Sequence, residues 1–280
     1  MKALQGEYRV GDLCKAFEVS RSGYHRWRTA GAGARAREDA RIAQTLREIH
    51  QGSRGTYGRP RLTAALRTRG FHCSQKRVGK LMRRLGLKGV RRGKFRPQTT
   101  QSADRTPAPN LLLHRKPASR PGEIWVADIT FVPTTEGWLY VACVMDQGSR
   151  RILGLAFSRR IDTSLCEAAL RQALLETNPA ANLIHHSDQG YQYSSSSYRR
   201  LLRQRRILQS MSRKANCYDN AHMESFWATL KTECLTASPS CSRSQAQLAI
   251  FSYIHTFYNR VRLHSALGFH SPVDFESINY

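Results

Sequence analysis

The sequence has no hydrophobic run long enough to cross a membrane. A spanning helix needs about 20 consecutive apolar residues, whereas the longest candidate run covers only residues 138–145. Residues 1–4 lead into polar sequence and not into the apolar stretch of a signal peptide. These absences argue against a membrane partner and predict a cytoplasmic protein.

Acidic residues are scarce. The 280 residues include 45 Lys and Arg against 20 Asp and Glu, a formal net charge of +25. Residues 1–122 hold 29 of the basic residues and only 7 of the acidic ones, so most of the excess lies there. A positive field of this kind favours nucleic acid, because phosphate neutralisation releases bound counterions. The front of the chain is therefore the expected polyanion binder.

The cysteines show no ordered pattern. There are seven of them, an odd number, and none has CxxC spacing. This argues against a disulfide framework and against a zinc knuckle, and it suits a reducing compartment.

Residues 9–28 have the spacing of a helix-turn-helix. Apolar residues share one helical face, the pattern breaks near Val19, and a second helix follows with Arg21 and Arg26 available to DNA. The alternative is an ordinary helical hairpin with a solvated basic face.

A second helical region follows. Residues 39–50 predict one helix, and residues 53–87 predict two more around a turn, with Gly70 as a stop signal and Ser74 as an N-cap. The last helix has a basic side without an acid, which favours contact with nucleic acid over a merely solvated face. The expected contacts on this helix are Lys76, Arg77, Lys80, Arg83 and Arg84.

The composition changes at residue 123. Three apolar, β-prone runs separated by turn residues predict three hairpin-linked strands, and alternating helices and strands follow them. The predicted order is βββαβαβα, an α/β fold with a mixed sheet behind an all-α front part.

Three acids stand out in this second half. Asp128 lies inside the first predicted strand, Asp188 follows a short buried strand, and Glu224 shares the flank of an amphipathic helix with Lys231. One such acid alone would more simply be paired with Arg or held by backbone. Three that converge suit divalent cations, and two cations about 4 Å apart could activate an attacking oxygen and stabilise the leaving oxygen of a phosphodiester.

At this point the sequence resembles a known family. Between Asp188 and Glu224 lie 35 residues, and the chain is similar to the OrfB-type transposases of the insertion-sequence-three family, which have a retroviral-integrase-like D,D(35)E core. The matching segments are WVADITFV, GWLYVACVMDQGSRRILG, HHSDQGYQY, SMSRKANCYDNAHMESFWATLKTE and YNRVRLHSALGFHSP, with VSRSGYHRW and YGRPRL nearer the front. The resemblance covers nearly the whole chain.

The resemblance implies a ribonuclease H-like core in which Asp128, Asp188 and Glu224 bind two Mg²⁺ or Mn²⁺ ions. The implied reactions are nicking at the ends of an insertion element and attack of the freed 3′-hydroxyl on another phosphodiester. The expected regions are a helix-turn-helix-like segment (1–30), a second helical DNA-binding domain (31–96), a basic Pro-rich linker (97–122), the catalytic core (123–240) and a C-terminal helical extension (241–280).

The resemblance also suggests DNA contacts around the acids. Lys231 matches a basic position near the scissile phosphate, and Asn220, Gln192 and Tyr193 match active-site or terminal-DNA positions. Asn220 has helix capping as its alternative. Arg213 and Lys214, in the loop before Glu224, are expected to contact the DNA backbone unless that loop is merely solvated. His185 and His186 are expected to be structural and are not assigned as metal ligands.

The expected partners are double-stranded DNA, as element terminal repeats and as target, and further copies of the chain in a homo-oligomer on that DNA. An upstream-frame helix-turn-helix protein or fusion is a further candidate partner, because terminal repeats are not clearly read by this chain alone. The expected location is the cytoplasm, in association with the nucleoid. Two alternatives stay open: a structure-directed metal-dependent nuclease, and a catalytically inert DNA-binding regulator.

Overall fold

The chain forms two compact units. The computed structural model describes residues 2–4, 6–29, 33–90, 107–213, 220–235 and 241–279. By their internal contacts, the first unit is Met1–Gly52 with Leu62–Leu87, and the second is Ser53–Arg61 with Lys88–Tyr280. Within the described ranges, no helix combines the length and the apolar character that a membrane span requires.

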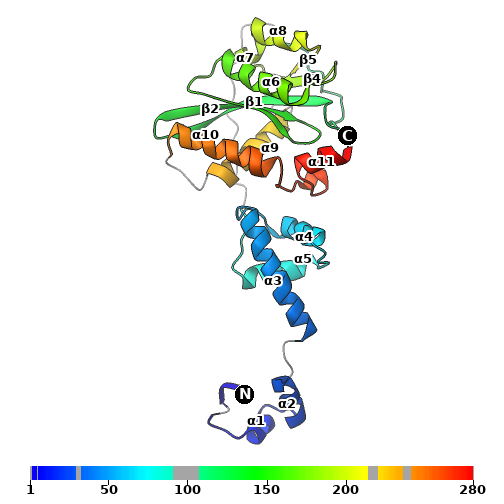
Figure 1. The fold of residues 1–280 in the computed structure, drawn as a ribbon, viewed down its shortest axis with the longest axis vertical. Coiled ribbons are helices and arrows are strands. Elements are labelled where there is room, and N and C mark those ends of the chain that lie inside the picture. The colour runs from blue at the N-terminus through cyan, green and yellow to red at the C-terminus, as the bar shows by residue number, and fades with distance from the viewer. Residues whose placement is uncertain are drawn as a thin grey trace. The chain divides into compact units, whose positions relative to one another are not determined.

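The first unit is helical, as Figure 1 shows in blue and cyan. Its elements are η1 (Lys2–Leu4), α1 (Val10–Ala16), α2 (Arg21–Thr29), α3 (Ala34–Gly52), α4 (Arg59–Thr68) and α5 (Gln75–Arg84). The last of these begins where the sequence predicts, because the Ser74 side chain accepts a hydrogen bond from the Arg77 backbone N–H. Gly70 has a positive φ of 81° at the turn between α4 and α5, a conformation that glycine adopts without strain.

The helical pair α1–α2 buries only part of its predicted apolar face. Leu13 and Cys14 are buried on α1, and Tyr24 is buried on α2. Phe17 and Trp27, which continue the same pattern, are 51% and 62% exposed. The pattern therefore predicts the two helices correctly and overestimates the size of their core.

The second unit is built on one mixed sheet. Its strands are β1 (Ile124–Thr134), β2 (Gly137–Asp146), β3 (Ile152–Ser158), β4 (Ile184–Ser187) and β5 (Leu208–Met211), in the spatial order β3-β2-β1-β4-β5. Strands β1, β2 and β3 are antiparallel neighbours, as hairpins require, whereas β4 pairs in parallel with both β1 and β5.

After β3, helices and strands alternate in the predicted order. The helices are α6 (Thr163–Thr177), α7 (Tyr191–Ser194), α8 (Ser196–Gln204), α9 (Ala221–Leu230), η3 (Lys231–Leu235), α10 (Arg243–Ser252), η4 (Tyr253–Tyr258), η5 (Ser265–Leu267) and α11 (Pro272–Asn279). The prediction βββαβαβα is confirmed, with the one-turn helix α7 as an addition before α8.

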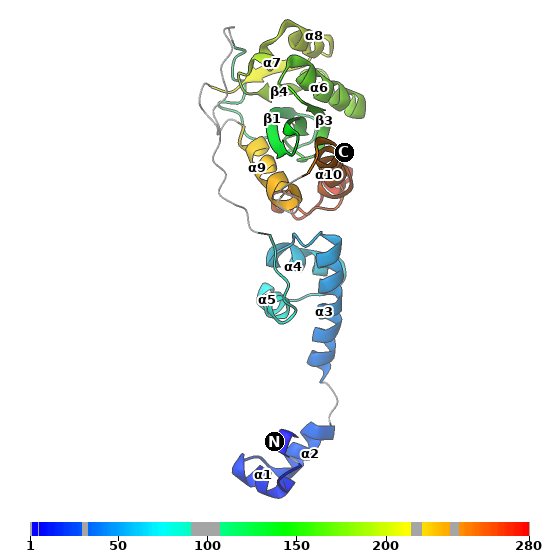
Figure 2. The same ribbon diagram turned by 90° about the vertical axis from the view of Figure 1, so that its left-hand side faces the viewer.

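The sheet is covered on both faces. Helices α6, α7 and α8 lie on one side, and α9 and α10 lie on the other (Figures 1 and 2). Trp125 and Ala127 of β1 share a core cluster with Leu170 of α6. Because side chains alternate along a strand, Asp128 must point to the opposite face, the one that α9 covers. At Gly154 of β3 the packing on α6 leaves no room for a side chain, because a Cβ there would lie 2.0 Å from a helix carbonyl oxygen.

A buried ion pair joins η3 to the C-terminal extension. Arg262 donates to the two carboxylate oxygens of Glu233 at 2.8 and 2.7 Å, and these side chains are 5% and 8% exposed. The Tyr253 hydroxyl donates to the same carboxylate at 2.8 Å. Burial alone would raise the pKa of Glu233, but the hydrogen bonds and the positive charge of Arg262 outweigh it and lower that pKa.

Residues 53–61 also pack against the C-terminal extension. The Tyr57 hydroxyl donates to the Val261 carbonyl at 2.9 Å and accepts from the Leu263 N–H at 2.8 Å. Arg61 donates to the Leu263 carbonyl at 2.8 Å. The predicted boundaries assign this stretch to the helical domain 31–96, whereas its contacts place it in the second unit. The difference arises because these bonds reach about 200 residues along the chain.

Candidate active site

Sheet pairing brings Asp128 and Asp188 together. Strands β1 and β4 run in parallel with Val126 beside His186. Continuing that register by two residues places Asp128 beside Asp188, just beyond the end of β4. The carboxyl end of one strand and the middle of its neighbour thus supply the first two acids, as the sequence predicts.

Asp128 lies in an unfavourable setting for a charge. Burial raises its pKa to about 7, and the negative charges of Asp188 and Glu224 act in the same direction. Hydrogen bonds from the Trp227 indole and from the Ile129 N–H oppose the rise. A carboxyl group whose pKa is raised by burial and by neighbouring acids is typical of a functional site that binds a cation.

Asp188 is held by the turn that follows it. Its Oδ1 accepts a hydrogen bond from the Gly190 N–H at 3.0 Å. A Cβ at Gly190 would lie 3.0 Å from that same oxygen and 2.6 Å from the side-chain oxygen of Gln192. A side chain at position 190 would therefore displace the Gln192 side chain and press against the Asp188 carboxylate.

Glu224 lies on α9, and Lys231 is the first residue of η3, which continues that helix. Met223, Trp227 and Leu230 form the buried face of α9, and both Glu224 and Lys231 are partly exposed. Burial raises the pKa of Glu224. Burial lowers the pKa of Lys231, and the charge of Asp128 opposes that change. The position of both residues on one flank of the helix stays a prediction.

Two side chains of α9 bond directly to β1. The Trp227 indole N–H donates to Asp128 Oδ2 at 2.9 Å, and the Asn220 side-chain amide donates to the Ala127 carbonyl at 3.1 Å. The sequence interpretation treats Trp227 only as a core residue. The signal that could have indicated more is its indole N–H, which needs an acceptor once the ring is buried.

The three acids do not form a finished metal site. Within the described ranges, no three His, Cys, Asp or Glu side chains are grouped closely enough to hold a metal ion. After burial, the charge of Asp188 is the largest cause that raises the pKa of Asp128, whereas the charge of Glu224 is the weakest of the causes that act on it. The arrangement is thus an acidic pair with a third carboxylate nearby.

Family models match most of the chain. The model of the integrase core domain matches residues 118–217, a second integrase core model matches residues 205–272, and an HTH-like domain matches residues 36–95. The chain is 41% identical to an uncharacterised 31 kDa protein of insertion element IS600 from Shigella sonnei, covering 94% of this chain and 97% of that one. It is 36% identical to transposase InsF for insertion sequence IS3A from Escherichia coli K12, over 98% of this chain and 96% of that one.

The chain belongs to the OrfB-type transposases of the insertion-sequence-three family. Its second unit is the ribonuclease H-like integrase core that the sequence predicts. Among solved structures, the HTLV-2 integrase catalytic core domain in complex with magnesium is similar to it, with a TM-score of 0.44 and 14% identity over 56% of this chain and 97% of that chain.

Several predicted DNA contacts of this transposase are buried. Tyr193 is 2% exposed, Gln192 5% and Asn220 8%. Tyr193 packs edge-on against Tyr198 in the core on the α6 side. A direct contact between the Tyr193 side chain and DNA would require that core to open, so packing accounts for this residue in the present structure.

The two histidines are structural, as expected. His185 Nε2 bonds to the Tyr198 hydroxyl at 3.0 Å, and His186 Nδ1 bonds to the Ser210 hydroxyl at 2.8 Å. Neither side chain is exposed. Burial lowers the pKa of His185 to about 3, which keeps it neutral.

The basic residues of the first unit fall into two groups. Arg77 pairs with Glu38 at 2.9 Å and with Asp39 at 2.7 Å, both from α3. The basic side of α5 carries no acid of its own, as predicted, but α3 supplies two acids that hold Arg77 in ion pairs within the first unit. The other expected contacts are exposed, namely Lys76, Lys80, Arg83 and Arg84 on α5 and Arg21 and Arg26 on α2.

The loop before α9 is only partly described. Arg213 is exposed at the end of β5, consistent with a contact to a DNA backbone. Lys214 lies outside the described residues, so its predicted contact with the DNA backbone stays a prediction.

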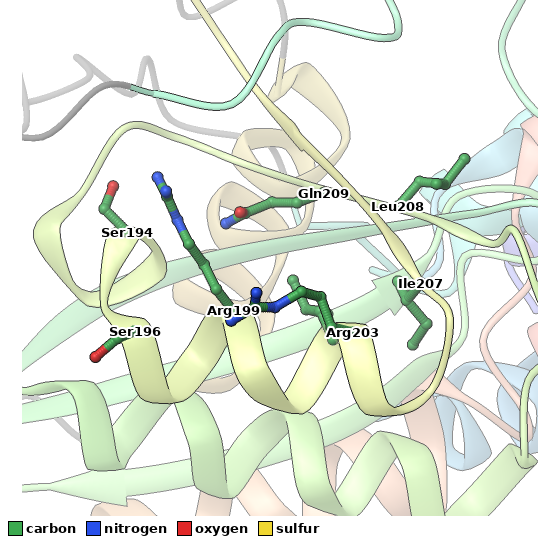
Figure 3. A pocket seen from close by; sticks show the side chains of 8 residues that line it. Ser194, Ser196, Arg199, Arg203, Ile207, Leu208 and Gln209 are labelled. Carbon is green, nitrogen blue, oxygen red and sulfur yellow. The ribbon is translucent and has the colours of Figure 1, made fainter.

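A separate pocket lies between α8 and β5, at the edge of the sheet (Figure 3). Arg199 and Arg203 project from α8 beside it. Its lining consists of Ser194, Ser196, Arg199, Leu202, Arg203, Ile207, Leu208 and Gln209. None of the three acids belongs to this lining, so this pocket is separate from the candidate active site.

Proposed function

We propose that this transposase nicks the ends of its insertion element and joins the freed 3′-hydroxyl to target DNA, with Asp128, Asp188 and Glu224 as its catalytic acids. The observation that carries the proposal is the pairing of β1 with β4, which places Asp128 beside Asp188, with α9, the helix that bears Glu224, bonded to Asp128. Burial and the two other acids raise the pKa of Asp128. Such a cluster is unstable by itself and is relieved by a cation. The reaction class follows from the family to which the chain belongs.

The donor chemistry of the cluster fits Mg²⁺ or Mn²⁺. Both prefer carboxylate oxygens, and the acids offer no soft ligand. Two ions held by Asp128, Asp188 and Glu224 would supply charge stabilisation for the attacking and the leaving oxygens of the phosphodiester. In this proposal the Trp227 N–H holds Asp128, and Lys231, whose pKa is lowered by burial against the opposing effect of the Asp128 charge, supplies the cation that attracts a phosphate.

The exposed basic residues support DNA binding by the first unit. We assign the phosphate contacts to Lys76, Lys80, Arg83 and Arg84 of α5, with Arg21 and Arg26 of α2. Near the acids we add Arg213 and Lys214 as backbone contacts. We expect copies of the chain to assemble on element ends and target DNA in the cytoplasm with the nucleoid, with an upstream-frame helix-turn-helix protein or fusion supplying repeat recognition if this chain alone lacks it.

A strand-transfer assay tests the proposal. Labelled terminal-repeat DNA is incubated with the chain and Mg²⁺ or Mn²⁺, with and without the upstream-frame protein, and nicked and joined products are separated. We expect both products from the wild type, their loss on chelation, and their loss in Glu224→Gln. Glu167→Gln serves as the matched control, because Glu167 is a partly buried acid of α6, on the other side of the sheet, that pairs with the exposed Arg171.

The outcomes separate the candidate functions. Full joining by Glu224→Gln would overturn the assignment of the acids. Cleavage without joined product would favour a structure-directed nuclease. Binding of labelled DNA without any nick in Mn²⁺ would favour an inert regulator.

A further inference from the structure

Helix α9 meets β1 at two hydrogen bonds, one on each side of Glu224 in the sequence. Asn220, four residues before Glu224, bonds to the carbonyl of Ala127. Trp227, three residues after it, bonds to the carboxylate of Asp128. Residues at these spacings share one face of a helix, so the two bonds and Glu224 all lie toward the strand that carries Asp128.

The Trp227 contact joins a core residue to an acid. Its side chain is 2% exposed and its ring lies 4.9 Å from the ring of Phe226. A buried indole N–H needs an acceptor, and Asp128 Oδ2 is the one the structure provides, at 2.9 Å. A hydrogen bond to a carboxylate is stronger than one between neutral groups, so it fixes the ring and the carboxylate against each other.

Asn220 behaves differently from an ordinary N-cap. It precedes the first residue of α9, yet its side chain makes no capping hydrogen bond. Its amide donates instead to the Ala127 carbonyl, the group next to Asp128 in the chain. The expected alternative, helix capping, is therefore not the use that Asn220 makes of its side chain.

We propose that Asn220 and Trp227 are positioning residues that set where Glu224 lies relative to Asp128. The bonding residues are seven apart, about two helical turns or ~10 Å. A helix bonded to one strand at two such points can neither slide along the strand nor rotate about its own axis. Glu224, between the two points, is thereby held at a set position beside Asp128. This proposal rests on the proposed catalytic role of the acids.

Trp227→Phe separates positioning from packing. Phenylalanine keeps an aromatic ring in the core and removes only the indole N–H and part of the ring. Trp125→Phe is the matched control: Trp125 is 1% exposed in the same strand as Asp128 but packs on the opposite face of the sheet. Both variants lose the same atoms from the core, and only one loses the bond to Asp128.

Three measurements on the full chain test the proposal. In the wild type, ¹⁵N-labelled in its four tryptophans, one indole N–H signal should be shifted downfield, absent from Trp227→Phe, and moved by Mg²⁺. Mn²⁺ affinity, measured by titration without DNA, should fall about tenfold in Trp227→Phe and stay unchanged in Trp125→Phe. Strand transfer should fall by a similar factor in Trp227→Phe and, to a smaller extent, in Asn220→Ala.

The outcomes of these measurements decide between positioning by Trp227 and Asn220 and packing alone. Equal Mn²⁺ affinity and joining in the wild type and in folded Trp227→Phe would overturn the proposal. If Trp227→Phe fails to fold, the wild-type indole spectrum and Asn220→Ala decide, and an indole signal unmoved by Mg²⁺ together with an unaffected Asn220→Ala would overturn it. A wild type that binds Mn²⁺ and shifts the indole signal but never joins DNA would refute the proposed function and leave the positioning intact.

Discussion

Replacing Asp128 by Asn should stabilise the metal-free protein while abolishing its reaction. Asparagine is similar in shape and uncharged. Its side-chain oxygen can still accept from Trp227, but its NH2 group cannot accept from the Ile129 N–H as Asp128 Oδ1 does, which reduces the gain. The charged form of Asp128 is disfavoured in the folded state, mainly by burial and then by Asp188 and Glu224. A substitution that removes this charge removes a cost of folding.

The magnitude follows from the pKa. The folded-state pKa is about 7 against 3.8 for an unperturbed Asp, a difference of about 3 units, and each unit corresponds to about 1.4 kcal/mol. Between these two values the folded state binds more protons than the unfolded state, so stability falls as pH rises from 3.8 to 7. The upper limit of the gain in Asp128→Asn above pH 7 is therefore about 4 kcal/mol, and partial exposure of the side chain reduces it.

The assay is urea unfolding followed by tryptophan fluorescence in the presence of a chelator. At pH 8 the free energy of unfolding of Asp128→Asn should exceed that of the wild type. The difference should shrink as pH falls toward 3.8, the unfolded-state pKa, below which Asp128 is mostly protonated in both states. Mg²⁺ should narrow the difference at pH 8, because it binds only the wild-type site. Glu167→Gln, a control whose partner Arg171 is exposed to solvent, should change stability by about 1 kcal/mol or less.

A wild type as stable as Asp128→Asn at pH 8 without metal would refute this reasoning. It would mean that the Asp128 charge is already satisfied by the protein, and that the acids do not need a cation.

Three further predictions concern other parts of the chain. Arg262→Met should destabilise the second unit by about 3–5 kcal/mol, because it leaves the Glu233 carboxylate buried without its main partner. In urea unfolding, Arg262→Met combined with Glu233→Leu should recover most of this loss. If the two substitutions lowered the free energy of unfolding additively, the buried pair would be contradicted. Because the pKa of Glu233 is lowered in the folded state, its contribution should be complete above its unfolded pKa and lost as pH falls through the folded pKa, so acid unfolding should be less steep in Glu233→Gln. Lys80→Gln should reduce the magnitude of the slope of log affinity against log salt by about 0.9 in DNA-binding titrations. Arg77→Gln should mainly destabilise the helical unit, because Arg77 is paired with acids of α3. Equal slopes for the two variants would argue against assigning Lys80 to DNA and Arg77 to an internal ion pair.

Local sequence patterns were sufficient to predict the elements of the core. The alternation of apolar residues around Asp128 predicts a strand, and the apolar run before Asp188 predicts a short buried one; both are present as β1 and β4. The apolar spacing around Glu224 predicts a helix, confirmed as α9, although it continues beyond Leu230 as the π-helical η3. These features depend on residues a few positions apart, whose periodicity is read directly along the chain.

The partners of these side chains were decided only by tertiary structure. The bond from Trp227 to Asp128 joins residues 99 positions apart, and it exists because strand alternation turns Asp128 toward the face that α9 covers. Arg77 forms an ion pair with Asp39 of α3, 38 positions earlier in the chain. Tyr193 is buried in the core, where α6 and α8 pack around it. Short-range periodicity determines which face of an element is apolar, and the pairing of elements determines which polar groups meet across those faces. The sequence alone therefore identified the three acids of this transposase, and only the fold showed which side chains hold them in place.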